Sequence, residues 1–146
     1  MMEEARQREL FKKFLADARI VIADTSSASR ARLAKTLVDL GAKMQLIELC
    51  GTYASAEEAI RKSKPRLLVS DYHLGSRSGF DLLDALKDCG DPAKRVFALV
   101  TANSSQSTIA RAAEEDVDVC VLKPYTIQML SKALVAAAIN KLHPSA

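Results

Sequence analysis

Short runs of apolar residues alternate along this chain with longer segments whose apolar positions recur at helical spacing. An apolar run of about five residues between helical segments indicates a buried strand. The runs are RIVIA from Arg19, MQLIEL from Met44, RLLVS from Arg66, VFALV from Val96 and VCVL from Val119. The pattern therefore predicts a sheet of five strands.

The segments between these runs carry helix signals. Leu33, Leu37 and Leu40 share one face of a first helix, and Gly41 follows as its C-terminal cap. Ser55 and Glu58 have the spacing of a capping box, which predicts that the second helix begins beside Ser55. The later helices are expected around Leu83 and Leu86 before Gly90, from about Ser105 to Glu115, and from about Thr126 to Leu142.

Regular alternation of strand and helix predicts a doubly wound α/β fold, with a mostly parallel sheet and helices on both of its faces. Ligands of such folds bind beyond the carboxyl ends of the strands. A further helical segment over residues 2–16 places Leu10, Phe11, Phe14 and Leu15 on one side. We therefore expect an N-terminal helical extension over residues 1–17 and one domain over residues 18–143.

Composition narrows the classes of protein to which this chain can belong. The 146 residues, 49% of them apolar, can bury a single core without disulfides. Cys50, Cys89 and Cys120 form no CxxC pair, so they are expected as small core residues rather than as a disulfide or zinc framework. No apolar run is long enough for a membrane span, and the charged opening MMEEARQREL does not resemble a signal peptide, so a cytoplasmic location is expected.

Charge gives no sign of direct nucleic-acid binding, because 21 basic and 18 acidic residues are interspersed without a basic arm. Arg30, Arg32 and Lys35 are expected on the solvated face of their helix.

Four different polar residues stand where predicted strands end: Asp24, Asp71, Thr101 and Lys123. A carboxylate can act as a nucleophile toward a phosphoryl donor when a divalent cation and an ammonium group offset the negative charges. Asp71 suits the nucleophile, and Asp24 with Asp71 can supply oxygen ligands to Mg²⁺. Lys123 and Thr101 can bind phosphoryl oxygens. Singly, each has an ordinary explanation, such as a turn or helix cap for Asp24; together they indicate a site.

Four motifs carry a family resemblance: IVIADTSSASR, SDYHLGSRSGFDLL, LVTA and VLKPY. Over about residues 18–142 the sequence resembles the receiver domain of bacterial two-component response regulators, of the kind found in chemotaxis regulators. The resemblance implies a flavodoxin-like sheet of strand order 2-1-3-4-5. It also implies that Asp71 is the phospho-acceptor, Asp24 an acidic-pocket residue, Thr101 the switch hydroxyl and Lys123 the phosphate-sensing lysine.

The same resemblance implies a Mg²⁺ cofactor, held by Asp24, Asp71 and the backbone carbonyl of His73, and a cis peptide before Pro124. His73 and Asn103 would tune how easily water reaches the phosphoryl group. The phosphodonor would be a sensor histidine kinase or a phosphotransfer protein. A downstream protein or a homodimer would respond, and the chain would be a regulatory phospho-acceptor rather than an enzyme.

Two positions depart from the usual receiver pattern. Thr25 stands where receivers usually carry a second acid, so weaker Mg²⁺ binding is expected, with the hydroxyl or water in its place. Cys120 replaces the aromatic residue that usually moves with the switch hydroxyl. These departures leave open a docking module that works without phosphorylation. A flavodoxin-like electron carrier, with a cofactor phosphate on the Thr25 to Ser29 loop, is a further alternative, which the absence of tryptophan disfavours.

Overall fold

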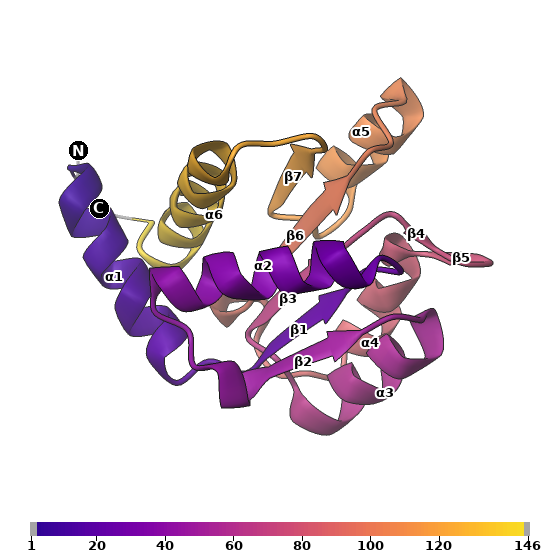
Figure 1. Cartoon of the computed structure of the whole chain (residues 1–146), viewed down its shortest axis with the longest axis horizontal. Helices are drawn as coiled ribbons and strands as arrows, with labels where there is room; N and C mark the ends of the chain where they lie inside the picture. Colours follow the sequence, from indigo (N-terminus) through magenta and orange to yellow (C-terminus); the bar gives the residue numbers. More distant parts are fainter. Residues whose placement is uncertain (1–2, 145–146) are drawn as a thin grey trace.

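A computed structural model describes residues 3–144, so the predicted start of the N-terminal segment at Met2 lies outside the described residues. Its centre is a parallel five-stranded sheet of order β2-β1-β3-β6-β7 (Figure 1). The strands are β1 (Ile20–Ala23), β2 (Ile47–Cys50), β3 (Leu67–Ser70), β6 (Val96–Thr101) and β7 (Val119–Leu122). Numbered along the chain, this is the order 2-1-3-4-5, so the predicted fold class is confirmed.

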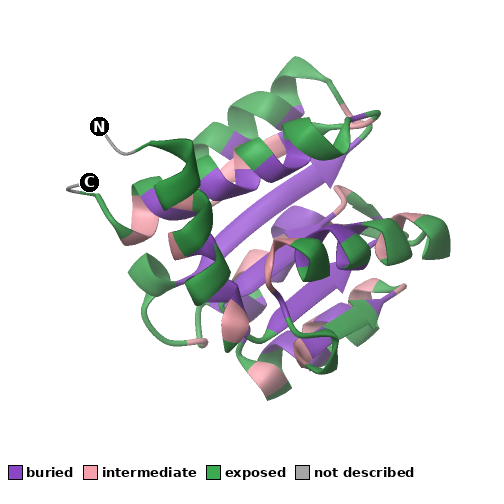
Figure 2. Ribbon diagram, turned by 60° about the vertical axis from the view of Figure 1, so that its left-hand side comes forward, coloured by how far each residue is buried: buried purple, intermediate pink, exposed green. Residues whose placement is uncertain are grey.

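Helices cover both faces of the sheet, and the central strands β1, β3 and β6 between them are buried (Figure 2). Ile20 and Ile22 point to one face, and Val21 and Ala23 to the other, as the alternation of a strand requires. The first face is covered by α1 (Glu4–Ala16), α2 (Ser27–Leu40) and α6 (Ile127–Leu142), and the second by α3 (Tyr53–Ser63), α4 (Leu83–Leu86) and α5 (Gln106–Glu114). Within residues 3–144, none of these helices is long and apolar enough to cross a bilayer.

The first helix contributes to the main hydrophobic core. Phe11, Phe14 and Leu15 are 1%, 8% and 0% exposed and belong to the same buried cluster as the inner faces of α2 and α6. The predicted apolar side of this segment is therefore confirmed. Figure 1 shows α1 beside the ends of α2 and α6, at the side of the sheet where the strands begin.

Two local predictions are wrong. The run from Met44 is not strand throughout: Met44–Leu46 form a 3-10 turn, η1, in which the N–H of Leu46 donates to the carbonyl of Lys43 at 2.9 Å. Helix α3 begins at Tyr53 rather than at Ser55, with Thr52 as its N-cap. The Thr52 hydroxyl accepts from the Ser55 N–H at 3.1 Å while the Ser55 hydroxyl accepts from the Thr52 N–H at 3.3 Å, so this pair forms the capping box.

A small hairpin lies outside the predicted pattern. It pairs β4 (His73–Leu74) with β5 (Arg77–Ser78) across Gly75 and Ser76. Gly75 has a φ of 79°, a backbone conformation that would be strained in a residue with a side chain. Gly-Ser, as in Gly75 and Ser76, is a known two-residue hairpin signal. The helix expected around Leu83 is only the short α4. The residues before it form the 3-10 segment η2 (Gly79–Leu82), and a second 3-10 segment, η3 (Pro92–Lys94), follows before β6.

The cysteines fit the core prediction in part. Cys50 is 4% exposed, whereas Cys89 and Cys120 are half-buried at the margin of the second cluster.

Candidate functional site

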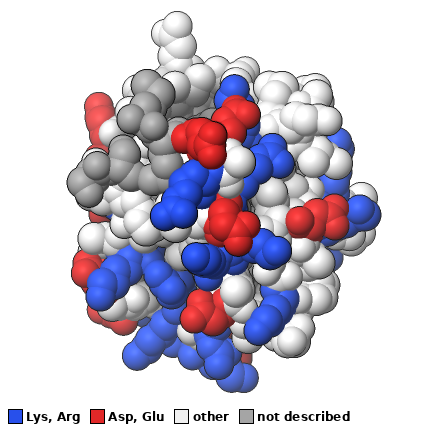
Figure 3. All heavy atoms as spheres, turned by 90° about the vertical axis from the view of Figure 1, so that its left-hand side faces the viewer, with Lys and Arg blue, Asp and Glu red and all other residues white. Residues whose placement is uncertain are grey.

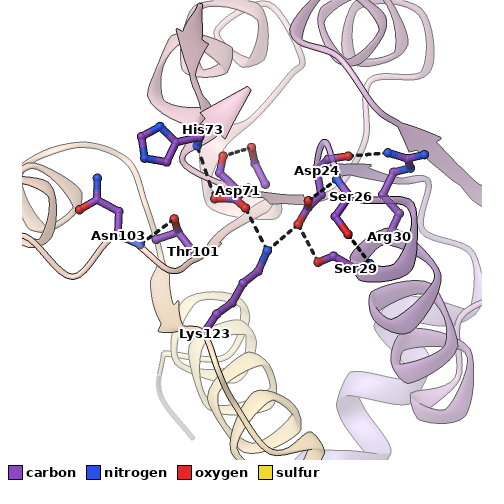
Figure 4. A network of polar contacts seen from close by, with 10 residues as sticks. Asp24, Ser26, Ser29, Arg30, Asp71, His73, Thr101, Asn103 and Lys123 are labelled. Atoms are coloured by element: carbon purple, nitrogen blue, oxygen red, sulfur yellow. Dashed lines mark hydrogen bonds and ion pairs between the residues drawn. The ribbon is translucent and has the colours of Figure 1, made fainter. Parts of the chain in front are cut away.

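The site lies at the carboxyl edge of the sheet, where four strands end side by side. Asp24 follows β1, Asp71 follows β3, Thr101 ends β6 and Lys123 follows β7. Because these strands are parallel and in register, their ends share one edge. Figure 4 shows Asp24 and Asp71 turned toward Lys123, so the predicted convergence of the two acids and the lysine is observed.

One ammonium group bridges both carboxylates. Lys123 Nζ donates to Asp24 Oδ2 at 2.7 Å and to Asp71 Oδ2 at 2.9 Å. The Asp24 side chain is 2% exposed, that of Asp71 15% and that of Lys123 22%. Burial would lower the pKa of Lys123, but the hydrogen bonds and charges of the two aspartates outweigh it and raise that pKa above its ordinary value of 10.5.

Asp24 has three donors. Its Oδ1 accepts from the backbone N–H of Ser26 at 2.9 Å, and its Oδ2 accepts from the Ser29 hydroxyl at 2.7 Å as well as from Lys123. Burial would raise the pKa of Asp24, but the hydrogen bond from Lys123 and those from Ser26 and Ser29 hold it below its ordinary value of 3.8. Asp24 is therefore an ionised, firmly held carboxylate.

Asp71 is held more loosely. Among residues 3–144, its Oδ1 accepts only from the backbone N–H of His73, at a long 3.4 Å. The backbone carbonyl of Asp71 has two close neighbours. The Ser70 hydroxyl donates to it at 2.8 Å, and Gly79 approaches it so closely that a Cβ at that position would lie 2.4 Å from the carbonyl oxygen. The main chain of Asp71 is thus closely packed, while one of its carboxylate oxygens accepts a single long hydrogen bond.

The side chains of Thr101 and Asn103 lie beside this centre and form hydrogen bonds elsewhere. The Thr101 side chain is buried, and its hydroxyl accepts from the Asn103 N–H at 3.2 Å. The Lys123 N–H donates to the Thr101 carbonyl at 2.8 Å, which couples the two strand ends. Asn103 Oδ1 accepts from the Ser105 N–H at 3.0 Å, ahead of α5, and Figure 4 shows that side chain away from Asp71.

The remaining predicted positions surround the site. Thr25 is exposed and lines a hollow of about 360 Å³ next to the β4–β5 hairpin. The His73 ring is exposed and lies edge-on to Tyr72, with 4.7 Å between ring centroids. Cys120 is half-buried on β7, where burial raises the pKa of its thiol. The peptide between Lys123 and Pro124 is cis, as the resemblance implies.

Sequence reasoning missed three residues that shape the site. Ser26 and Ser29 hold the Asp24 carboxylate, and the guanidinium of Arg30 donates to the Asp24 carbonyl at 2.7 Å. The prediction that Arg30 lies on a solvated helix face is therefore wrong. Arg30 is half-buried over Gly51, and the lack of a side chain on that glycine makes room for its guanidinium. Arg32 and Lys35 are exposed as expected. An aspartate two residues before a helix N-cap serine is the signal that could have indicated this loop.

The oxygen groups present fit Mg²⁺ in kind. Asp24 and Asp71 offer carboxylates and Thr25 a hydroxyl, and hard oxygen ligands are those that Mg²⁺ prefers. Among residues 3–144, however, no group of three or more His, Cys, Asp or Glu side chains is arranged to hold a metal. The two carboxylates present are already shared with one lysine, and the strength of Mg²⁺ binding stays a prediction.

Comparison with known protein families assigns the chain to a class of protein. The family model of the response regulator receiver domain matches residues 20–135, so the chain belongs to this family. Receiver domains of this family are regulatory parts of two-component systems and generally bind Mg²⁺ at their acidic pocket.

Individual relatives agree with this assignment. The chain is 25% identical over 118 residues to a probable chemotaxis protein CheY of Rhizobium etli, covering 81% of this chain and 90% of the relative. Its fold is similar to a CheY-like receiver domain protein from Methanospirillum hungatei, with a TM-score of 0.72 at 20% identity over 84% of this chain and 94% of that one. It is also similar to the chemotaxis response regulator CheY4 of Vibrio cholerae, with a TM-score of 0.70 at 19% identity over 82% and 98% of the two chains.

Proposed function

We propose that this protein is a phosphorylation-controlled switch in which Asp71 accepts a phosphoryl group. The donor is the phosphohistidine of a sensor histidine kinase or a phosphotransfer protein. The observation that supports this most is the single ammonium of Lys123, which contacts Asp71 and Asp24 at 2.9 Å and 2.7 Å on the open edge of the sheet. A lysine so placed can follow negative charge as it moves from the carboxylate to a phosphoryl oxygen.

The chemistry of transfer assigns a role to each side chain. An Asp71 carboxylate oxygen attacks phosphorus as the N–P bond of the phosphohistidine breaks, and the leaving nitrogen keeps the bonding electron pair and takes up a proton. Mg²⁺, when bound through Asp24 and Asp71, supplies charge neutralisation. Asp24 keeps Lys123 charged and in place, and the buried Thr101 hydroxyl is a donor for a phosphoryl oxygen once its side chain turns. Water then returns the domain to its resting state.

The proposed responding surface is formed by α5, β7 and the start of α6, next to the Thr101 and Lys123 strand ends. Four of the seven large apolar side chains that are exposed on the described residues lie there: Ile109, Leu122, Ile127 and Met129. Apolar groups exposed close together mark a contact surface for a protein partner. A downstream protein or a second copy of this chain would bind there.

One alternative function has specific support. A docking module that works without phosphorylation is favoured by the three donors that already occupy the Asp24 carboxylate, and by Thr25 in place of a second acid. The family assignment lends no support to an electron carrier.

Phosphorylation of Asp71 is tested by incubating the protein with acetyl phosphate, with and without Mg²⁺, and recording intact mass. We expect one phosphoryl adduct that requires Mg²⁺ and is absent from Asp71→Asn, because an amide is not a nucleophile toward phosphorus at neutral pH. The matched control is Asp118→Asn, which removes a carboxylate at the opposite edge of the sheet and should leave the adduct unchanged. No adduct in the wild type at high Mg²⁺ would favour the docking module, whereas an adduct of equal yield in Asp71→Asn would mean that another residue accepts the phosphoryl group.

A second prediction concerns the missing acid. Thr25→Asp should tighten Mg²⁺ binding about tenfold, because one more carboxylate raises the ligand charge of a hard-cation site. Calorimetric titration with Mg²⁺ measures the change. Thr52→Asp is the matched control, since it adds the same charge on the same hollow at a helix N-cap that accepts aspartate. Equal gains in both variants would mean that nearby charge alone, rather than a ligand at position 25, accounts for the effect.

A further inference from the structure

The edge of the sheet opposite Asp71 is rich in basic residues. Arg19, Arg66 and Arg95 directly precede β1, β3 and β6, whose first residues are in register. Backbone bonds join this edge: the N–H of Arg66 donates to the carbonyl of Arg19 at 3.0 Å, and the N–H of Val96 to that of Arg66 at 2.8 Å. Figure 3 shows this side of the molecule, with Lys and Arg gathered on it and fewer acidic groups between them.

A hollow of about 660 Å³ opens on this face, between α1, the start of β3, η3 and the end of α6. Apolar side chains from α1 and α6 line it, namely Leu10, Phe14 and Leu142, and three of its other lining residues are basic: Lys13, Arg66 and Lys94. Asp17 is the one acidic residue in the lining. The hollow therefore combines an apolar lining with a net positive charge.

Arg66 is fixed in a way that leaves its outer nitrogens for a ligand. Its Nε donates to the Lys94 carbonyl at 3.3 Å, and its Cζ lies 4.9 Å from the centroid of the Phe14 ring. Within the described part of the chain, neither of its terminal nitrogens has a hydrogen bond, and Lys13, Arg66 and Lys94 take part in no ion pair. A guanidinium held on an aromatic face, with its outer nitrogens open, is ready for bidentate binding of a carboxylate.

We infer that this hollow docks an acidic segment of a partner protein, whose carboxylates pair with Arg66, Lys13 and Lys94 while an apolar side chain enters between Leu10 and Leu142. A membrane surface is disfavoured because Phe14 is only 8% exposed and the apolar lining is recessed rather than protruding. A nucleic acid is disfavoured because Arg66 covers the Phe14 ring of the hollow, so no base can stack on that ring.

The position of this surface gives it a distinct role. It lies at the amino edge of the sheet, whereas Asp71 lies at the carboxyl edge, so a partner bound there contacts none of the residues around Asp71. A partner bound there would anchor the domain permanently, and the surface beside Thr101 would remain free to respond. The inference stands whether or not Asp71 is phosphorylated.

The test uses a short fluorescein-labelled peptide of Glu-Glu-Leu-Glu repeats, with fluorescence anisotropy at about 0.05 M and about 0.15 M salt. We expect binding to the full chain that weakens with salt and falls at least about tenfold in the double variant Arg66→Gln with Lys94→Gln. The matched control, Lys35→Gln with Lys62→Gln, removes two charges from other helices and should change the affinity less than about twofold. Lys94→Gln alone, at an exposed position, gives a partial loss without disturbing the Phe14 contact.

Companion probes distinguish the other occupants. A peptide of Gln-Gln-Leu-Gln repeats, vesicles of phosphatidylcholine and phosphatidylglycerol in equal parts, and a DNA duplex should each bind more weakly than the acidic peptide. Absence of peptide binding, equal loss in the control pair, or preferential binding of vesicles or duplex that depends on Arg66 and Lys94 would overturn the inference.

Discussion

Lys123→Met is expected to destabilise the protein by about 3 kcal/mol near neutral pH, because it leaves two carboxylates facing each other without a cation. Asp24 is the more affected, since its side chain is only 2% exposed and loses one of its three donors. Methionine keeps most of the length of the lysine side chain, so the loss comes from charge rather than from a cavity. Mg²⁺ should restore part of the stability, because a divalent ion can take over the charge of the ammonium.

The pH dependence should reverse in this variant. In the wild type the pKa of Asp24 is depressed, so its contribution to stability is present above the ordinary value of 3.8 and is lost as the pH falls through the folded-state pKa. Without the hydrogen bond and the charge of Lys123, burial is the largest remaining influence, and it raises the pKa of Asp24. A raised pKa gives stability that is present at low pH and is lost as the pH rises, so Lys123→Met should be closest to the wild type in acid.

Urea unfolding at about pH 4.5 and about pH 7.5, with and without Mg²⁺, measures both effects. Lys141→Met is the control: it breaks the ion pair with Asp118, which has similar exposure, 23% and 18%, but contains only one carboxylate. That control should lose stability without reversing its pH dependence and without responding to Mg²⁺. A Lys123→Met variant that is as stable as the wild type at neutral pH would contradict the bridging role of this lysine.

Phe11→Ala is expected to cost about 3–5 kcal/mol in the free energy of unfolding, the range for deleting a buried aromatic side chain. The ring is 1% exposed and packs in the cluster shared by α2, α6 and the first face of the sheet. Losses of this size are comparable to the whole stability of a small domain. Urea unfolding followed by circular dichroism measures the change.

The exposed residue Arg8 on the same helix provides the control, since Arg8→Ala should change stability by less than about 0.5 kcal/mol. Deletion of residues 1–17 should destabilise the chain at least as much as Phe11→Ala. A full-stability domain after that deletion would support a separable extension, whereas the loss we expect would mean that residues 1–17 and 18–143 form one folding unit.

The sequence predicted the sheet because β1 and β7 are apolar along their whole length, and β3 and β6 are apolar up to the Ser70 and Thr101 that end them. The order of strand and helix also admits few topologies. The wrong prediction at Met44 comes from the same use of apolar runs. Such a run does not show that the chain after α2 makes the turn η1 before β2 begins, and Met44 is 51% exposed in that turn. The α3 start was misplaced because Thr52 and Ser55 compete with Ser55 and Glu58 for the same capping pattern.

The sequence predicted which residues meet at the site, but it did not predict the hydrogen bonds between them. Strand ends in a parallel sheet bring Asp24, Asp71 and Lys123 together whatever the side chains do. That Ser29 donates to Asp24, and that Arg30 turns inward over Gly51, depends on the path of the chain through Thr25 and Ser26 into α2. Likewise Asn103 bonds to the Ser105 N–H rather than to the site, a choice set by local turn geometry.

Two edges of one sheet thus carry two different chemistries. The carboxyl edge holds carboxylates around one lysine and is suited to a transient phosphoryl group. The amino edge presents Arg66 and neighbouring lysines around an apolar hollow and is suited to a lasting protein contact. A domain with both could remain attached to a partner while its phosphorylation state changes.

The most direct test of the central claim is to locate the phosphoryl group after treatment with acetyl phosphate and Mg²⁺. Borohydride reduces an aspartyl phosphate to homoserine, and peptide mass spectrometry then identifies the residue that was modified. The account predicts homoserine in place of Asp71, with Asp24 and every other aspartate unchanged. Homoserine at another position would contradict the account. So would the absence of homoserine together with an intact protein that carries no phosphoryl adduct.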